Sequence, residues 1–209
     1  MKYTESLFNT IILLQHLAEL QKTDNINIYY IDLYCEAGGT SSGVELATIN
    51  GKKVAKVIVC VNHDKNAIAS HMANHPYALH FTEDMRTLDL TPIVHIVKKI
   101  RFTNPNAKIV LWASLECTNF SKAKGGQSRD ADSRTLAEHL YRYIEAINPD
   151  YVQIENVVEF QSWGPLIIKT SKTKEGLEYC PCNIEKIKVP KKRGEKKGFK
   201  WNLSQKMVP

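Results

Sequence analysis

The sequence has no long hydrophobic run and few cysteines. None of its apolar stretches approaches the roughly 18 residues of a membrane-spanning helix, and no basic, apolar and small-residue leader follows Met1. We therefore expect a cytoplasmic protein without membrane contact. The five cysteines are an odd, scattered set, which favours free thiols over a disulfide framework; they are Cys35, Cys60, Cys117, Cys180 and Cys182.

Glycine and proline are also scarce, with ten and eight residues among 209. These contents exclude a collagen-like or low-complexity chain. A hydrophobic content of 43% beside 24% charged residues is that of a chain that folds. The length predicts one main domain.

Acidic residues are scarce only near the C-terminal end. Residues 169–209 contain 12 of the 28 Lys and Arg residues and four of the 22 Asp and Glu residues, a net charge of +8, so the rest of the chain carries −2. This division indicates that any phosphate contact is concentrated at the C-terminal end. A solvated, Lys-rich segment is the alternative.

Hydrophobic patterns of strand and helix alternate along the chain. Their order predicts an α/β, Rossmann-like fold, with a mostly parallel sheet and helices on both faces. The expected strands are Ile28–Tyr34, Val54–Val61, Lys108–Ala113 and Tyr151–Ile154, with a short apolar stretch at Ala78–Phe81. The expected helices are Thr4–Leu20, capped by Thr4, Lys65–Ala73, Thr91–Ile100 and Arg134–Ile147.

The alternating pattern ends near residue 160. We expect a main domain at residues 1–160, whose N-terminal helix lies within residues 1–24. Residues 161–209 are expected to form an irregular basic tail, because glycine and proline recur there among lysines.

A glycine turn follows the first expected strand, within Asp32 to Gly43. In a Rossmann-like sheet, such a turn lets the backbone approach a ligand beside a helix N-terminus. Its glycines lack the G-x-G-x-x-G spacing of a dinucleotide loop, which argues against a nicotinamide or flavin cofactor. The alternative is a tight strand-to-helix turn without a ligand.

Polar residues follow the other expected strands. Asn62 and His63 come after the second strand, where a ribose is commonly bound, although they also suit a helix cap. Asp84 follows the stretch ending at Phe81, where a carboxylate can accept from an adenine amino group. Cys117 follows a strand at the same edge, a suitable place for a nucleophile, although most intracellular cysteines only pack. Glu155 leaves a hydrophobic strand, which predicts a raised pKa and a role in proton donation.

In this order, the segments resemble the DNA (cytosine-5) methyltransferase family over about Ile28 to Phe160. The family's first motif, Asp-Leu-Phe-Cys-Gly-Ala-Gly-Gly followed by Ser and Gly, matches Asp32 to Gly43 except at Tyr34 and Glu36. Three further motifs, Pro-Cys-Gln-x-Phe-Ser, Asp-Ser-Arg-x-x-Leu and Glu-Asn-Val, resemble Glu116–Ser121, Asp132–Leu136 and Glu155–Val157. Asp132–Leu136 has one residue between Arg134 and Leu136, where the motif has two.

The resemblance implies a bacterial or phage-encoded enzyme of DNA methylation and restriction–modification. Such an enzyme transfers a methyl group from S-adenosylmethionine to carbon 5 of cytosine in double-stranded DNA. The family's nucleophile, here Cys117, adds to carbon 6 of a flipped base, and its Glu, here Glu155, contacts ring nitrogen 3. Asn156 is then expected to brace the loop that carries the thiol.

The same resemblance implies a cofactor site of the S-adenosylmethionine-dependent methyltransferase type. The turn cradles the methionine end of the cofactor, Asn62 stands where the family has a ribose-binding Glu, with His63 beside it, and Asp84 contacts adenine. From the first motif the cofactor-binding residues are Asp32, Tyr34, Cys35, Ala37, Gly38 and Gly39.

Two departures from the family pattern concern chemistry. Glu116 replaces the Pro before the nucleophile, which should raise the pKa of the Cys117 thiol. Asn62 in place of Glu should weaken the ribose contact by about 1 kcal/mol.

Several family segments are not found: the Gln-x-Arg-x-Arg strand, the target recognition domain and the closing motif. We therefore expect a missing C-terminal or separate recognition domain as a partner, with residues 161–209 as the start of that region. The alternative to an enzyme is a truncated or degenerate homologue that binds the cofactor, DNA or a partner chain without catalysis.

No metal site is expected. Cys180 and Cys182 are followed by no second Cys or His pair at usable spacing. His71 and His75 share a helical face, but they match no metal-binding motif, and we expect them at the surface.

Overall fold

The computed structural model describes residues 2–116, 136–162, 166–173 and 176–186. They fall into two compact units, the first containing the elements up to residue 156 and the second those from residue 157 on. Cys117 and the other residues of 117–135 lie outside the described residues. The predictions that concern this segment are therefore carried by the sequence alone.

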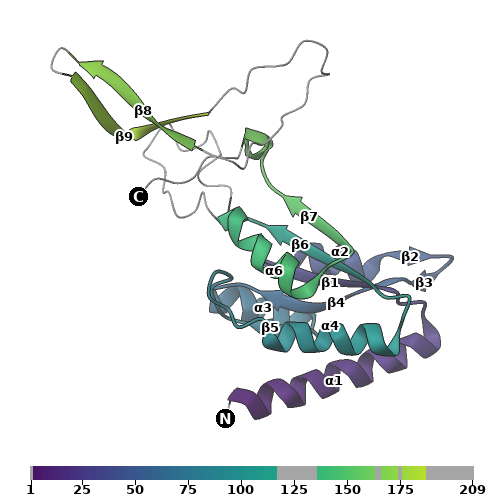
Figure 1. Cartoon of the computed structure of the whole chain (residues 1–209). Helices are drawn as coiled ribbons and strands as arrows, with labels where there is room; N and C mark the ends of the chain where they lie inside the picture. Colours follow the sequence, from purple (N-terminus) through teal and green to yellow (C-terminus); the bar gives the residue numbers. More distant parts are fainter. Residues whose placement is uncertain (1, 117–135, 163–165, 174–175, 187–209) are drawn as a thin grey trace. The chain divides into compact units, whose positions relative to one another are not determined.

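A five-stranded parallel sheet forms the centre of the first unit (Figure 1). The chain runs from β1 outward through β4 to β5 and then returns to β6, beside β1, so its direction of progress reverses between β1 and β6. Rossmann-like sheets bind ligands at the carboxyl ends of the strands near this reversal. The order across the sheet is β5 (Leu79–Phe81), β4 (Ala55–Val61), β1 (Ile28–Leu33), β6 (Lys108–Ser114) and β7 (Tyr151–Glu155).

Helices cover both faces of this sheet. Crossovers between parallel strands are right-handed. The helices of connections that run towards β5 therefore lie on one face, and the helices of connections that run towards β7 lie on the other. Val44 and Ile68 place α2 and α3 over one buried cluster, whereas α4 packs against α6, and α1 packs against α4. The helices are α1 (Lys2–Thr23), α2 (Gly39–Leu46), α3 (Lys65–Asn74), α4 (Thr91–Thr103) and α6 (Leu140–Ile147), which follows the 3-10 helix η2 (Leu136–His139).

The core lies between the sheet and these helices. All seven residues of β4 are buried, as a central strand covered on both faces requires. Pro92 lies in the first turn of α4. Backbone N–H groups there have no acceptor within the helix, so the absent N–H of proline costs no helical hydrogen bond. Its buried residues recur at helical spacing and form one apolar face; they are Ile93, Ile96, Val97 and Ile100.

The predicted fold class is confirmed, and several details differ from expectation. Helix α1 begins at Lys2, so Thr4 lies inside the helix rather than capping it. The hairpin of β2 (Thr48–Ile49) and β3 (Lys52–Lys53) was not expected, although Asn50 and Gly51, both with positive φ, are the residues that favour such a turn.

Strand β7 is exposed along its whole length, so the hydrophobic surroundings assumed for Glu155 are absent from the described part of the chain. Within the stretch expected to be irregular, the second unit has an antiparallel pair, β8 (Leu166–Thr173) with β9 (Gly176–Lys186), after the 3-10 helix η3 (Val158–Ser162). None of the described helices has the length and hydropathy needed to cross a bilayer.

Candidate functional site

The predicted site residues follow the carboxyl ends of the sheet strands. Asp32 is the penultimate residue of β1, and Asn62 directly follows β4. Asp84 comes after β5, and Glu155 ends β7. Because the strands are parallel, these ends share one edge of the sheet. The sequence predicted this placement.

The glycine turn after β1 has a left-handed backbone at three positions: Tyr34 (φ 60°), Glu36 (φ 46°) and Gly38 (φ 94°). The Tyr34 N–H donates to the Val61 carbonyl at 2.8 Å, which fixes the turn to the end of β4. A Cβ atom at Gly38 would lie 3.0 Å from side-chain atoms of His71 and His75. Glycine at this position is thus required by both the backbone angle and the close packing.

Helix α2 begins at Gly39, immediately after this turn. No described side chain caps its N-terminus, and a Cβ atom at Gly39 would meet no described atom within 4 Å. The first N–H groups of a helix have no partners within the helix and carry its positive dipole end. This end of α2 therefore suits a carboxylate or another anionic group of a ligand.

Asp32 is buried beneath the turn and is 1% exposed. The Ser41 hydroxyl donates to its Oδ2 atom at 2.7 Å. Burial raises the pKa of Asp32 to about 6, an effect that the Ser41 hydrogen bond opposes. No described group donates to its Oδ1 atom.

Glu36 and Asn62 form a pair that sequence reasoning missed. Buried Asn62 donates from Nδ2 to Glu36 Oε1 at 3.2 Å, and the Asp64 N–H fixes its orientation by donating to its Oδ1 atom at 2.9 Å. The carboxylate of Glu36, an exposed residue, is therefore held at the end of β4. The sequence contained a signal for this pair. The chain has Glu36 where the family motif has Gly and Asn62 where the family has Glu, so one carboxylate is gained and one is lost.

Tyr34 lies close to groups from three further strand ends. Burial raises the pKa of Tyr34 to about 12, and the charges of Glu116 and Asp84 add to this effect. The ring of His63 meets that of Tyr34 edge-on, with 6.2 Å between centroids. The sheet edge thus brings the ends of β1, β4, β5 and β6 together, as the sequence predicted.

Asp84 is already engaged by a neighbour. Arg86 donates to both carboxylate oxygens of Asp84, with Nε–Oδ1 and Nε–Oδ2 distances of 3.0 and 2.8 Å. These hydrogen bonds hold the pKa of Asp84 below its usual range. Any further donor to Asp84 must therefore share this carboxylate with Arg86.

The segment that carries Asp84 is anchored to α6. The Arg142 guanidinium donates to the carbonyls of Met85 and Leu88 at 2.9 and 2.7 Å, and also to that of Arg86. The Tyr143 hydroxyl donates to Met85 at 2.9 Å. Helix α6 therefore holds the segment that follows β5 and carries Asp84.

The end of β7 lies beside the segment that leads to Cys117. Asn156 Nδ2 donates to the Leu115 carbonyl at 3.0 Å, and Glu155 pairs in register with Ser114. Asn156 thus braces the backbone two residues before Cys117.

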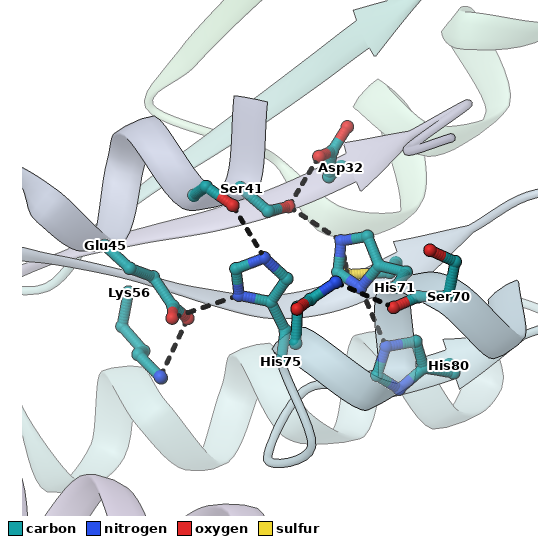
Figure 2. A network of polar contacts seen from close by, with 11 residues as sticks. Asp32, Ser41, Glu45, Lys56, Ser70, His71, His75 and His80 are labelled. Atoms are coloured by element: carbon teal, nitrogen blue, oxygen red, sulfur yellow. Dashed lines mark hydrogen bonds and ion pairs between the residues drawn. The ribbon is translucent and has the colours of Figure 1, made fainter. Parts of the chain in front are cut away.

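Beneath the glycine turn lies a buried polar network that includes His71 and His75, two residues predicted to lie at the surface (Figure 2). His71 is 0% and His75 is 5% exposed, so that expectation was wrong. His71 Nε2 lies 2.9 Å from Ser41 Oγ. His75 Nδ1 lies 3.1 Å from Glu45 Oε2, and Lys56 Nζ lies 2.7 Å from Glu45 Oε1. These buried polar groups thus have hydrogen-bond partners within the network, as buried polar groups in proteins generally do.

A parallel sheet with this strand order, with helices on both faces and a glycine turn after its first strand, defines a Rossmann-like α/β domain. The chain belongs to the C-5 cytosine-specific DNA methylase family, whose sequence profile matches residues 28–164. It is 30% identical over 155 residues to the type II methyltransferase M.AgeI of Thalassovita gelatinovora, covering 71% of this chain and 33% of that protein.

Two solved structures are also similar. One is described as a DNA modification methyltransferase encoded within an E. coli prophage, with 28% identity and a TM-score of 0.46 over 64% of this chain and 33% of that chain. The other is a Spodoptera frugiperda DNMT2 variant, with 18% identity and a TM-score of 0.44 over 64% of this chain and 36% of that chain. The chain spans about a third of the length of the relatives it matches.

Proposed function

We propose that this chain is the catalytic and cofactor-binding part of an S-adenosylmethionine-dependent DNA (cytosine-5) methyltransferase. The observation that carries the proposal is the brace from Asn156 to the Leu115 carbonyl at 3.0 Å. It joins the Glu-Asn-Val motif to the segment ahead of Cys117, at the sheet edge that also holds the glycine turn. Double-stranded DNA is the proposed substrate.

The residues of the glycine turn fit the methionine end of S-adenosylmethionine. The N-terminus of α2, which no described side chain caps, suits its carboxylate. The Oδ1 atom of Asp32, to which no described group donates, suits an ammonium group. Glu36, held by Asn62 at 3.2 Å, is positioned to accept from the ribose hydroxyls, a task that an acidic residue performs in related folds. Asp84 is the acceptor proposed for the adenine amino group.

Each catalytic residue has a defined task in this proposal. The Cys117 thiolate adds to carbon 6 of a flipped cytosine, and Glu155 contacts ring nitrogen 3 and stabilises the charge that develops in the ring. S-adenosylmethionine, when bound, supplies the electrophilic methyl group that carbon 5 attacks. Loss of the carbon 5 proton then expels the Cys117 thiolate and restores the aromatic ring.

Covalent capture on DNA that contains 5-fluorocytosine tests this mechanism. Fluorine at carbon 5 cannot leave as a proton does, so the Cys117 adduct persists after methyl transfer. We expect an adduct that requires S-adenosylmethionine and disappears in Cys117→Ser, while Cys180→Ser still forms it. DNA of random sequence is used as the probe.

Two results would count against the proposed catalysis. An adduct that persists in Cys117→Ser would refute the assigned nucleophile. Binding of S-adenosylmethionine without any adduct would favour a homologue that binds the cofactor without catalysis or requires a separate recognition domain.

A further inference from the structure

Two buried cysteines and a buried histidine meet beneath the glycine turn. Cys35 lies in the turn, Cys60 in β4 and His71 in α3, and all three are buried. The two sulfur atoms and a ring nitrogen of His71 all lie within 4.8 Å of one another. The cluster draws on three separate elements, so only the fold brings its members together.

The other ring nitrogen of His71 also has a polar partner. His71 Nδ1 lies 2.9 Å from His80 Nε2. Histidines that bind a metal ion commonly have such a partner on the ring nitrogen that does not bind the ion.

The Nε2 atom of His71 faces the thiols and the Ser41 hydroxyl. His71 Nε2 lies 3.3 Å from Cys60 Sγ and 2.9 Å from Ser41 Oγ. The Ser41 hydroxyl donates its proton to Asp32 Oδ2 at 2.7 Å, so the Ser41 oxygen still has lone pairs with which to bind a cation.

We propose that Cys35, Cys60 and His71 bind a zinc ion, with Ser41 Oγ placed to supply a fourth donor. In tetrahedral zinc sites, bond lengths of about 2.3 Å to sulfur and 2.0 Å to nitrogen separate neighbouring ligand atoms by about 3.6 to 3.8 Å. The present separations reach that geometry through shifts of about 1 Å. Two thiolates and an imidazole select zinc over magnesium or calcium, which prefer oxygen ligands.

Zinc binding also has a defined proton balance. Zinc binds cysteine as the thiolate and histidine as the neutral imidazole, so the Cys35 and Cys60 thiols each give up a proton when the ion binds. Two zinc–sulfur bonds and one zinc–nitrogen bond form, and the two thiol protons pass to the solvent.

The ion would link Cys35 in the glycine turn to β4 and α3. Such a link would fix the turn before a ligand binds. This consequence rests on the proposed function, because it assumes that the turn holds S-adenosylmethionine. Zinc binding itself does not depend on that assumption and is measured separately.

The test uses the full chain with Cys117→Ser, Cys180→Ser and Cys182→Ser combined. Cys35 and Cys60 are then the only cysteines, so any thiolate-bound metal identifies the proposed site. We expect this background variant to retain one zinc ion per chain after dialysis with a thiol-free reductant. Calorimetry in buffers of different ionisation enthalpy should detect about two protons released per ion.

Cobalt provides a readout that needs no further substitution. Co²⁺ added to the background variant should give thiolate-to-cobalt charge-transfer absorption and tetrahedral ligand-field bands. Adding Cys60→Ala or Cys35→Ala should abolish the bound zinc and this spectrum, with circular dichroism verifying that each variant is folded. Less than stoichiometric zinc together with no charge-transfer band in the folded background variant would overturn the proposal, as would full zinc retention after Cys60→Ala.

Loss of zinc and failure of the proposed function are distinguishable. A protein that binds zinc but not S-adenosylmethionine would support the metal site and contradict the cofactor site. The opposite result would contradict the metal site alone.

Discussion

At the scale of single residues, Glu36 and Asn62 decide whether the proposed cofactor site retains a carboxylate at the end of β4. Charged hydrogen bonds contribute about 1.5 to 3 kcal/mol, so Glu36→Gln should weaken S-adenosylmethionine binding about tenfold to a hundredfold by calorimetry. Glu145→Gln removes an exposed carboxylate from α6 and should leave the affinity unchanged. Equal affinity for Glu36→Gln and the unaltered chain would exclude Glu36 from the site.

A double variant tests whether the two positions act as one unit. Glu36→Gly combined with Asn62→Glu moves the carboxylate to the end of β4, and Gly also suits the φ of 46° at position 36. Its affinity should exceed that of Glu36→Gly alone. Additive losses from the two substitutions would mean that the positions are independent.

Asp32 predicts a pH dependence of stability. Its pKa is about 6 in the folded chain against an ordinary value of 3.8, so the folded state binds this proton more tightly than the unfolded state. Asp32 therefore contributes stability fully below about pH 3.8 and loses it as the pH rises through about 6. Two pKa units correspond to about 3 kcal/mol.

Asp32→Asn removes this titration while its side-chain oxygen still accepts from Ser41. As the pH rises from 4 to 7, the free energy of unfolding of Asp32→Asn should increase relative to that of the unaltered chain by up to about 3 kcal/mol. Urea titrations at several pH values provide the measurement. The lowered pKa of His71 reduces stability as the pH falls from 6.5 towards 4, but this acts on both proteins and cancels. A constant difference would show that Asp32 is not desolvated.

At the scale of elements, the turn from β1 to α2 depends on Gly38. Gly38→Ala places a Cβ atom 3.0 Å from two histidine side chains at a φ of 94°, so the free energy of unfolding should fall by more than about 1 kcal/mol. Gly43→Ala, within α2, meets nothing within 4 Å and should raise it by about 0.5 to 1 kcal/mol. Chemical denaturation of both variants checks this contrast, and equal effects would remove the special role of Gly38.

The central elements could be predicted from the sequence because their patterns are local. The apolar run Val57–Val61 and the helical spacing within Thr91–Thr103 each report burial directly. The burial of His71 could not be predicted, because it depends on partners such as Ser41 and His80 that the fold brings to α3. The exposure of β7 was missed because an apolar run does not show whether neighbours cover it.

The candidate site was predictable to the extent that it lies at strand ends. The positions of Asp32, Asn62 and Asp84 follow from the order of strands and turns. The hydrogen bond between Glu36 and Asn62 joins residues 26 apart in sequence, and the bond from Arg86 to Asp84 competes with the role expected for that carboxylate. Such contacts are set by side-chain geometry, which periodicity does not encode.

At the scale of the whole molecule, the family profile covers residues 28–164, and the chain spans about a third of its relatives. The first unit contains every described residue assigned to the cofactor. Cofactor binding is therefore the part of the proposed activity that depends on described residues of the first unit. It also requires no knowledge of a DNA target sequence.

The most direct test is calorimetric titration of the full chain with S-adenosylmethionine, S-adenosylhomocysteine and NAD. The carboxylate-rich edge and the uncapped end of α2 predict micromolar dissociation constants for both adenosyl ligands. NAD should not bind, because the glycine turn lacks the spacing of a dinucleotide loop. Absence of binding by both adenosyl ligands, or equal binding of NAD, would contradict the proposed cofactor site.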